Sequence, residues 1–123
     1  MANDGNLDAW ERLWKQAKAG LRTNEAYFRM LGRNADGSNN PEYECLLDVD
    51  NLIDYMLCVY YTGNRDSPLG GPGRGSMPRN LFALYNRTSP DGFKFVAHDG
   101  EHCLGYHLSA GVDYNFITDY PVM

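Results

Sequence analysis

The stretch that decides how this chain folds is Gly92-Phe93-Lys94-Phe95-Val96-Ala97-His98-Asp99-Gly100-Glu101-His102. Phe93 and Phe95 alternate with Lys94, which is the period of a half-buried β-strand. The strand is followed directly by two carboxylates and two imidazoles, and such groups do not help to build an apolar core. Carboxylates two residues apart at the end of a strand can hold a hard divalent cation, because the strand fixes their oxygens at a rigid edge.

A second strand is predicted before this one. Residues 80–87 alternate loosely between apolar and polar side chains, and the turn sequence Ser89-Pro90-Asp91-Gly92 separates them from residues 93–97. This pattern predicts an antiparallel hairpin. In an antiparallel pair the start of one strand lies beside the end of the other, so Asn80 is expected near Asp99.

A second polar cluster, Asn64-Arg65-Asp66, follows the strongest predicted helix, Asp50 to Tyr61, and precedes a glycine- and proline-rich loop at Ser67 to Pro78. The helix has a broad apolar stripe, which predicts a central core helix. The stripe consists of Leu52, Tyr55, Met56, Val59 and Tyr60. We expect Asp66, Asn80, Asp99 and Glu101 to converge on one place in the folded chain.

Two further helices are predicted near the start of the chain. Leu7 to Ala19 carries apolar residues at helical spacing, with Asn6 as a plausible cap and a core face made of Leu7, Trp10, Trp14 and Ala17. Asn24 to Leu31 reads as a short helix capped by Thr23, with its inward face at Tyr27, Phe28 and Leu31. Helices together with a hairpin predict an α+β fold.

Composition limits the class of protein. With 123 residues, of which 43% are hydrophobic, the chain holds at most one modest domain with a packed core. A net charge of −5 argues against nucleic acid or an anionic membrane as a partner. The sequence contains neither a bilayer-length apolar window nor a visible signal peptide. Three cysteines, Cys45, Cys58 and Cys103, are interpreted as free or buried thiols, and a disulfide between two of them stays open.

The converging side chains suggest a chemistry. Two carboxylates and an amide oxygen suit Mg²⁺ or Mn²⁺, which keep waters and take substrate phosphates as their remaining ligands. Asp66, one step removed, would be free to position a hydroxyl nucleophile. The order of a loop Asp, an Asn, a hairpin and a second Asp is also that of a protein-kinase active site. The glycine-rich insert accounts for the longer separation of Asp66 from Asn80.

Four motifs carry a resemblance to a known family: Asp48-Val49-Asp50-Asn51-Leu52-Ile53-Asp54-Tyr55-Met56, Tyr61-Thr62-Gly63-Asn64-Arg65-Asp66, Arg79-Asn80-Leu81-Phe82-Ala83-Leu84-Tyr85 and Gly92 to His102. They resemble the CotH-type, or spore-coat-H-like, atypical kinases, and most closely the branch found in large, secreted, multidomain bacterial proteins. The resemblance implies an atypical protein-kinase-like fold. Residues 1–123 would then be a partial CotH-like domain, the core of the C-terminal lobe, without the N-terminal nucleotide lobe.

The same resemblance implies an activity and a set of roles. The family transfers phosphate from ATP, with Mg²⁺ or Mn²⁺, to Ser or other hydroxyls on a protein substrate, and this piece would hold that machinery incompletely. Asp66 would be the catalytic-loop aspartate, and Asn80 and Asp99 would bind the metal and its nucleotide. Glu101 stands where relatives often carry a second acidic residue, and it would be a further metal ligand. The parent protein is expected to be extracellular or at the cell surface.

Two other readings stay open. One is a non-catalytic structural or interaction module of a secreted protein, whose acidic loop binds Ca²⁺ or nothing. The other is a transition-metal site for hydrolysis built from His98, Asp99, His102 and His107. Adjacent strand residues point to opposite faces, which separates His98 from Asp99, and the His-Glu-x-x-His spacing is absent from the sequence.

Overall fold

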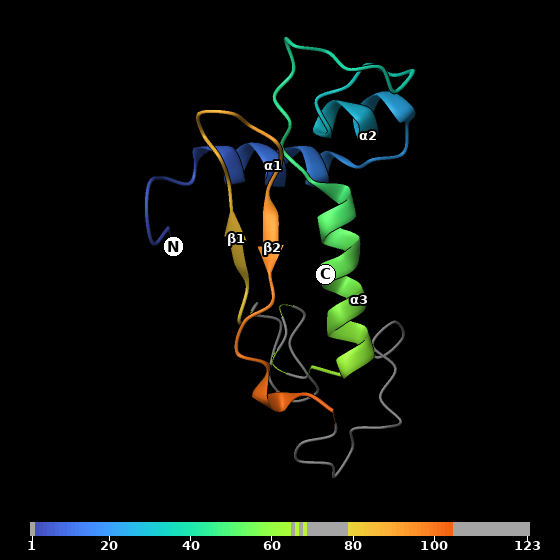
Figure 1. The fold of residues 1–123 in the computed structure, drawn as a ribbon. Helices are drawn as coiled ribbons and strands as arrows, with labels where there is room; N and C mark the ends of the chain where they lie inside the picture. The colour runs from blue at the N-terminus through green and yellow to red at the C-terminus, as the bar shows by residue number, and fades with distance from the viewer. Residues whose placement is uncertain (1, 65, 67, 69–78, 105–123) are drawn as a thin grey trace. The chain divides into compact units, whose positions relative to one another are not determined.

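The computed structural model describes residues 2–64, 66, 68 and 79–104 of the chain. This part is a small α+β fold, as the sequence predicts, with a two-stranded antiparallel sheet (Figure 1). Its elements are α1 (Asp8–Ala19), α2 (Asn24–Met30), α3 (Val49–Thr62), β1 (Phe82–Leu84), β2 (Lys94–Val96) and the 3-10 turn η1 (Gly100–His102). None of the helices in this described part combines the length and apolarity needed to cross a membrane.

The chain divides into two compact units. The first consists of Met1–Asp50 with Leu84–Lys94, and the second of Asn51–Ala83 with Phe95–Met123. Each unit has its own small core among the described residues. The first is built around Met30, Leu46 and Phe93, and the second around Tyr55 and Val59.

Helix α1 buries a different face from the predicted one. Ala9 and Leu13 are its buried residues, and Trp10 meets the ring of Phe93 edge-on at 5.4 Å between centroids. Trp14 is 52% exposed, with the Lys18 ammonium 5.7 Å from its ring centroid. The prediction that Trp14 belongs to the core is therefore wrong, because helical spacing shows which residues share a face but not which face meets a partner.

Helix α2 begins as predicted. The Thr23 side chain accepts a hydrogen bond from the Ala26 N–H at 3.1 Å, which satisfies one of the free donors of the first turn. At the other end of α2 the carbonyl of Met30 accepts from the N–H groups of Leu46 and Leu47 at 2.9 and 3.2 Å. Met30, which lies outside the predicted inward face, is almost fully buried.

The backbone of Phe93 joins the hairpin to residues 46–48. Its N–H donates to the carbonyl of Leu46 at 3.0 Å, and its carbonyl accepts from the N–H of Asp48 at 3.4 Å. The ring of Tyr85 stacks on the ring of Phe93 at 4.5 Å between centroids. Phe93 is thus fixed by main-chain bonds and buried by aromatic neighbours within the first unit.

Gly92 permits this close approach. Its φ is +95°, and a Cβ at this position would collide with the backbone of Leu47 and Asp48. Both the left-handed backbone and the lack of space require glycine here.

A charged network ties α1 to the hairpin. The Arg12 guanidinium donates to both carboxylate oxygens of Glu44, at 2.7 and 2.6 Å, and the Tyr85 hydroxyl donates to the same carboxylate at 2.7 Å. These hydrogen bonds, that of Arg12 foremost, lower the pKa of Glu44. Burial and the neighbouring carboxylate raise the pKa of Tyr85, which stays protonated as a donor.

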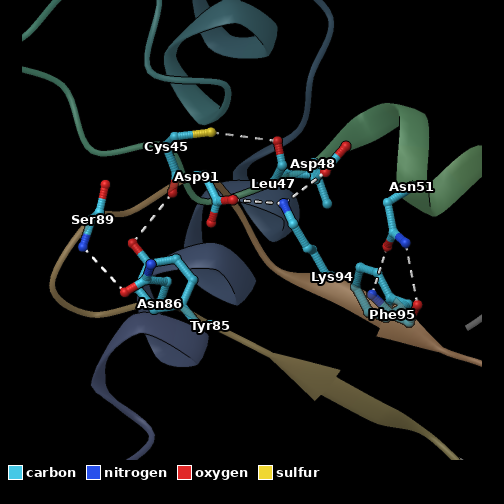
Figure 2. Close-up of polar contacts among 10 residues, drawn as sticks. All are labelled: Cys45, Leu47, Asp48, Asn51, Tyr85, Asn86, Ser89, Asp91, Lys94 and Phe95. Atoms are coloured by element: carbon cyan, nitrogen blue, oxygen red, sulfur yellow. Dashed lines mark hydrogen bonds and ion pairs between the residues drawn. The ribbon is translucent and has the colours of Figure 1, made fainter.

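Lys94 lies between two carboxylates at the start of β2. Its ammonium is 2.8 Å from Asp91 and 2.9 Å from Asp48. Both contacts, drawn as dashed lines in Figure 2, raise the pKa of Lys94. The ion pairs hold the turn before β2 against the residue that precedes α3. Their contribution to stability is small because the groups are substantially exposed.

The second unit is built on α3. Tyr55 and Val59 are buried, and Tyr55 stacks on Phe95 at 5.8 Å between centroids. Asn51 clasps the main chain of Phe95: its side-chain oxygen accepts from the Phe95 N–H at 2.6 Å, and its side-chain nitrogen donates to the Phe95 carbonyl at 3.3 Å (Figure 2). Tyr60, predicted in the core stripe, is 39% exposed, so that part of the prediction is wrong.

The strands are shorter than predicted because the turn begins earlier. The side-chain oxygen of Asn86 accepts from the N–H groups of Thr88 and Ser89 at 3.1 and 3.2 Å. This local bonding takes the place of ladder bonds beyond Leu84, where β1 ends. The three cysteines are free thiols, one of the two states that the sequence left open.

Gly92→Ala is expected to destabilise the chain by about 3 kcal/mol or more, since backbone strain and overlap with main-chain atoms add. Gly20→Ala is the matched control, because Gly20 has nearly the same φ, +93°, with open space around its Cβ position. Gly20→Ala should lower the free energy of unfolding by only about 1–2 kcal/mol, from backbone strain. Urea unfolding measures both, and equal losses would contradict the close-approach argument.

Glu44→Gln is expected to reduce stability at pH 7 and to change its acid dependence. A carboxyl whose pKa is lowered on folding stabilises the protein above its unfolded pKa of about 4.3 and loses that effect as pH falls through the folded value. The difference in the free energy of unfolding between Glu44→Gln and the parent should therefore become smaller below about pH 4. Denaturant unfolding from pH 7 to pH 3 tests this, with the exposed neighbour Glu42→Gln as control. If the free energy of unfolding of Glu44→Gln follows that of the parent at a constant difference across this pH range, Glu44 does not contribute in this way.

Candidate functional site

The predicted site residues all lie in the second unit, and the first group follows the end of α3. Gly63, with φ of +61°, ends the helix, and the N–H of Asn64 donates to the carbonyl of Val59 at 3.1 Å. Asn64 is buried, and its side-chain oxygen accepts from the N–H of Asp66 at 3.0 Å. This turn, closed by a side chain, presents Asp66 just beyond the helix.

Asp66 and Asn80 come together although they are 14 residues apart. The Asn80 side-chain nitrogen donates to Oδ2 of Asp66 at 3.1 Å, and a guanidinium nitrogen of Arg79 lies 3.7 Å from Oδ1. The side chain of Asp66 is only 14% exposed. Asn80 has φ of +46°, a left-handed conformation that asparagine tolerates better than most residues.

Asp99 and Glu101 follow β2 in an exposed bend. Asp99 has φ of +56°, which turns the chain into η1, where Glu101 lies. Both side chains are exposed, and Glu101 Oε1 is 3.2 Å from Nε2 of His102. Glu101 is therefore engaged with a neighbour rather than pointing alone into solvent.

Two contacts bring this bend toward the other site residues. His98 stacks on Phe82 at 4.5 Å between ring centroids, so the residue before Asp99 lies against the first residue of β1. Beyond η1, the N–H of Leu104 donates to the carbonyl of Thr62 at 2.7 Å, and the Cys103 thiol lies 3.4 Å from the Thr62 hydroxyl. The acidic bend is thus anchored on one side at β1 and on the other at the last residue of α3.

The ligands available to a metal in this region are limited. Among the described residues, no three His, Cys, Asp or Glu side chains lie close enough together to hold a metal ion. The oxygen donors that the sequence predicts for a metal here are the carboxylates of Asp99 and Glu101 and the amide oxygen of Asn80. Hard oxygen donors with open positions fit Mg²⁺ or Mn²⁺.

The transition-metal alternative gains no support from the contacts of its residues. The His98 ring is stacked on Phe82, and the His102 ring is paired with Glu101. His107, the fourth residue of that hypothesis, lies outside the described residues.

Sequence reasoning grouped Asn64 with Asp66 but gave it no role, and it missed Asn51. The signal for Asn64 was available, since an asparagine two residues before an aspartate, directly after a helix-ending glycine, favours a turn closed by its own side chain. Asn51 carries no such signal, because its partner Phe95 is 44 residues away.

No protein-family model, curated protein or solved structure matches the chain.

Asn80→Ala is expected to cost about 2 kcal/mol, roughly half from the lost hydrogen bond to Asp66 and half from the left-handed backbone. Asn80→Gly removes the same bond without the strain, so it should cost about 1 kcal/mol. Urea unfolding of both variants separates the two terms. Identical losses would mean that the backbone of Asn80 is unstrained.

Proposed function

We propose that this chain is the core of a CotH-like kinase C-terminal lobe, which transfers the γ-phosphoryl group of ATP to a protein hydroxyl with Mg²⁺ or Mn²⁺. The observation that carries the proposal is the hydrogen bond from the Asn80 amide to Asp66 Oδ2. In kinase chemistry the loop aspartate acts on the acceptor hydroxyl and the asparagine holds the metal on the transferred phosphate, so the two side chains must lie near each other.

The direction of that hydrogen bond supports a role for the other end of the amide. An asparagine side chain has one oxygen acceptor and one nitrogen donor. Because the nitrogen of Asn80 is engaged by Asp66, the amide orientation is fixed and its oxygen is directed elsewhere. A fixed, neutral oxygen is a suitable ligand for a hard cation.

Asp99 and Glu101 would supply the charged ligands. Asp99 follows His98, whose ring stacks on Phe82, and Phe82 is two residues after Asn80. Glu101 lies three residues before Leu104, which bonds to the carbonyl of Thr62. Glu101 would have to leave His102 to bind metal, so Asp99 is the stronger ligand of the two. The bound cation would neutralise charge on the transferred phosphate.

Asp66 would act on the acceptor. Its Oδ2 accepts from Asn80, and a carboxylate retains further lone pairs that can orient a substrate hydroxyl. Arg79, 3.7 Å from Oδ1, is a second side chain that holds this carboxylate in place. A positioned carboxylate of this kind contributes about 10²–10⁴ to the rate in enzymes.

The alternative is a non-catalytic structural or interaction module. The pairing of Glu101 with His102 favours it, because that contact satisfies one of the two acids without any metal. In this case the acidic bend would be a surface feature, and neither metal nor nucleotide would bind tightly.

Mn²⁺ binding distinguishes the two. We expect Mn²⁺, alone and with ATP, to raise the melting temperature, since a ligand at a hundred times its Kd adds about 2.7 kcal/mol. Asp99→Asn should weaken Mn²⁺ binding by about tenfold or more, measured by water-proton relaxation. Asp54→Asn, which removes an exposed carboxylate from α3, is the matched control and should bind like the parent.

Transfer of labelled γ-phosphate to a protein acceptor, measured with the chain joined to a nucleotide lobe, tests the activity itself. Asp66→Asn should lower kcat by about 10²-fold or more while leaving Mn²⁺ affinity within a few-fold. If Mn²⁺ gives no thermal shift, and Asp99→Asn behaves like Asp54→Asn, the kinase proposal fails and the interaction module is favoured.

A further inference from the structure

Asn64 has features that the proposed catalytic and metal roles do not use. It is the buried polar residue of the described chain, 9% exposed, and it lies between α3 and Asp66. Burying an amide is unfavourable unless its groups are hydrogen-bonded. Its backbone N–H is bonded to Val59, and its side-chain oxygen to the N–H of Asp66.

These contacts form a line that ends at the proposed metal ligand. Val59 is fixed in α3 and holds Asn64 at 3.1 Å, Asn64 holds Asp66 at 3.0 Å, and Asp66 holds the Asn80 amide at 3.1 Å. Each link fixes the position of the next. Because the Asn80 side-chain nitrogen donates to Asp66, the side-chain oxygen is the atom left to bind a cation.

We propose that Asn64 is a positioning residue, which transmits the fixed geometry of α3 through Asp66 to the Asn80 amide. The inference rests on the proposed function, because it assigns Asn64 a part in orienting the same metal ligand. Asn64 does not touch the cation or the substrate. Its effect passes through Asp66, as outer partners of metal ligands do in other sites.

The geometry explains why a short acceptor is needed at this position. The Asn64 oxygen reaches the N–H two residues ahead, which closes a turn that asparagine and aspartate form well. Alanine has no acceptor there, so the turn would open and Asp66 would lose its fixed place. Aspartate keeps the acceptor and should preserve the turn.

A double-mutant cycle on Mn²⁺ affinity tests the inference. Asn64→Ala should weaken Mn²⁺ binding by about tenfold, the lower end of the range for outer partners of metal ligands. Asn64→Asp should recover most of the loss. In a chain that already carries Asn80→Ala, Asn64→Ala should have no further effect, since its route to the metal is gone.

Val59→Ala is the control for simple destabilisation. It removes buried methyl groups from α3 while keeping the backbone bond from Asn64 to the Val59 carbonyl. Its melting temperature should fall, with Mn²⁺ affinity within twofold of the parent. If Val59→Ala weakens binding as much as Asn64→Ala, or if the effects of Asn64→Ala and Asn80→Ala simply add, the inference is overturned.

A second readout needs no metal. The Asn80 side-chain amide protons, followed by NMR, should exchange with solvent slowly in the parent and faster in Asn64→Ala. Unchanged exchange overturns the positioning role whatever the metal result. The parent can fail to bind Mn²⁺ while amide exchange at Asn80 still becomes faster in Asn64→Ala. In that case the proposed function is wrong, and the effect of Asn64 on the Asn80 amide is confirmed.

Discussion

The first unit depends on the pairing of Phe93 with residues 46–48, made by both its N–H and its carbonyl. Phe93 donates to Leu46 and accepts from Asp48, and this pairing brings two stretches distant in sequence to within a hydrogen bond of each other. The approach is so close that Gly92 has no room for a side chain. Aromatic burial follows from it, because Trp10 and Tyr85 pack on a ring whose position the main chain has already set.

The second unit uses asparagine amides for a similar purpose. Asn51 closes on the main chain of Phe95, Asn64 on that of Asp66, and Asn80 on the Asp66 carboxylate. An amide has a donor and an acceptor at fixed ends, so it specifies direction as well as distance, which a carboxylate alone does not. This explains how Asp66 and Asn80 hold defined positions next to the end of α3.

Local patterns predicted much of the fold. The Thr23 cap, the long helix α3 and the hairpin all follow from short-range sequence chemistry. The errors at Trp14 and Tyr60 have a common cause: spacing identifies an apolar face, but burial needs a partner for that face. The nearness of Asp66 and Asn80 agreed with the predicted order of elements. The contact itself depends on a left-handed residue and a closed turn, and neither can be read from spacing alone.

The clasp of Asn51 on Phe95 has an evolutionary consequence. Asn51 bonds only to the backbone N–H and carbonyl of Phe95, so position 95 can accept any side chain that packs on Tyr55. Proline is the exception, because it has no backbone N–H. Position 51 has no such freedom, since aspartate lacks the donor and glutamine is a methylene too long. Mutations tolerated at this contact should therefore accumulate on the strand side and spare the helix side, so that the two partners evolve at different rates.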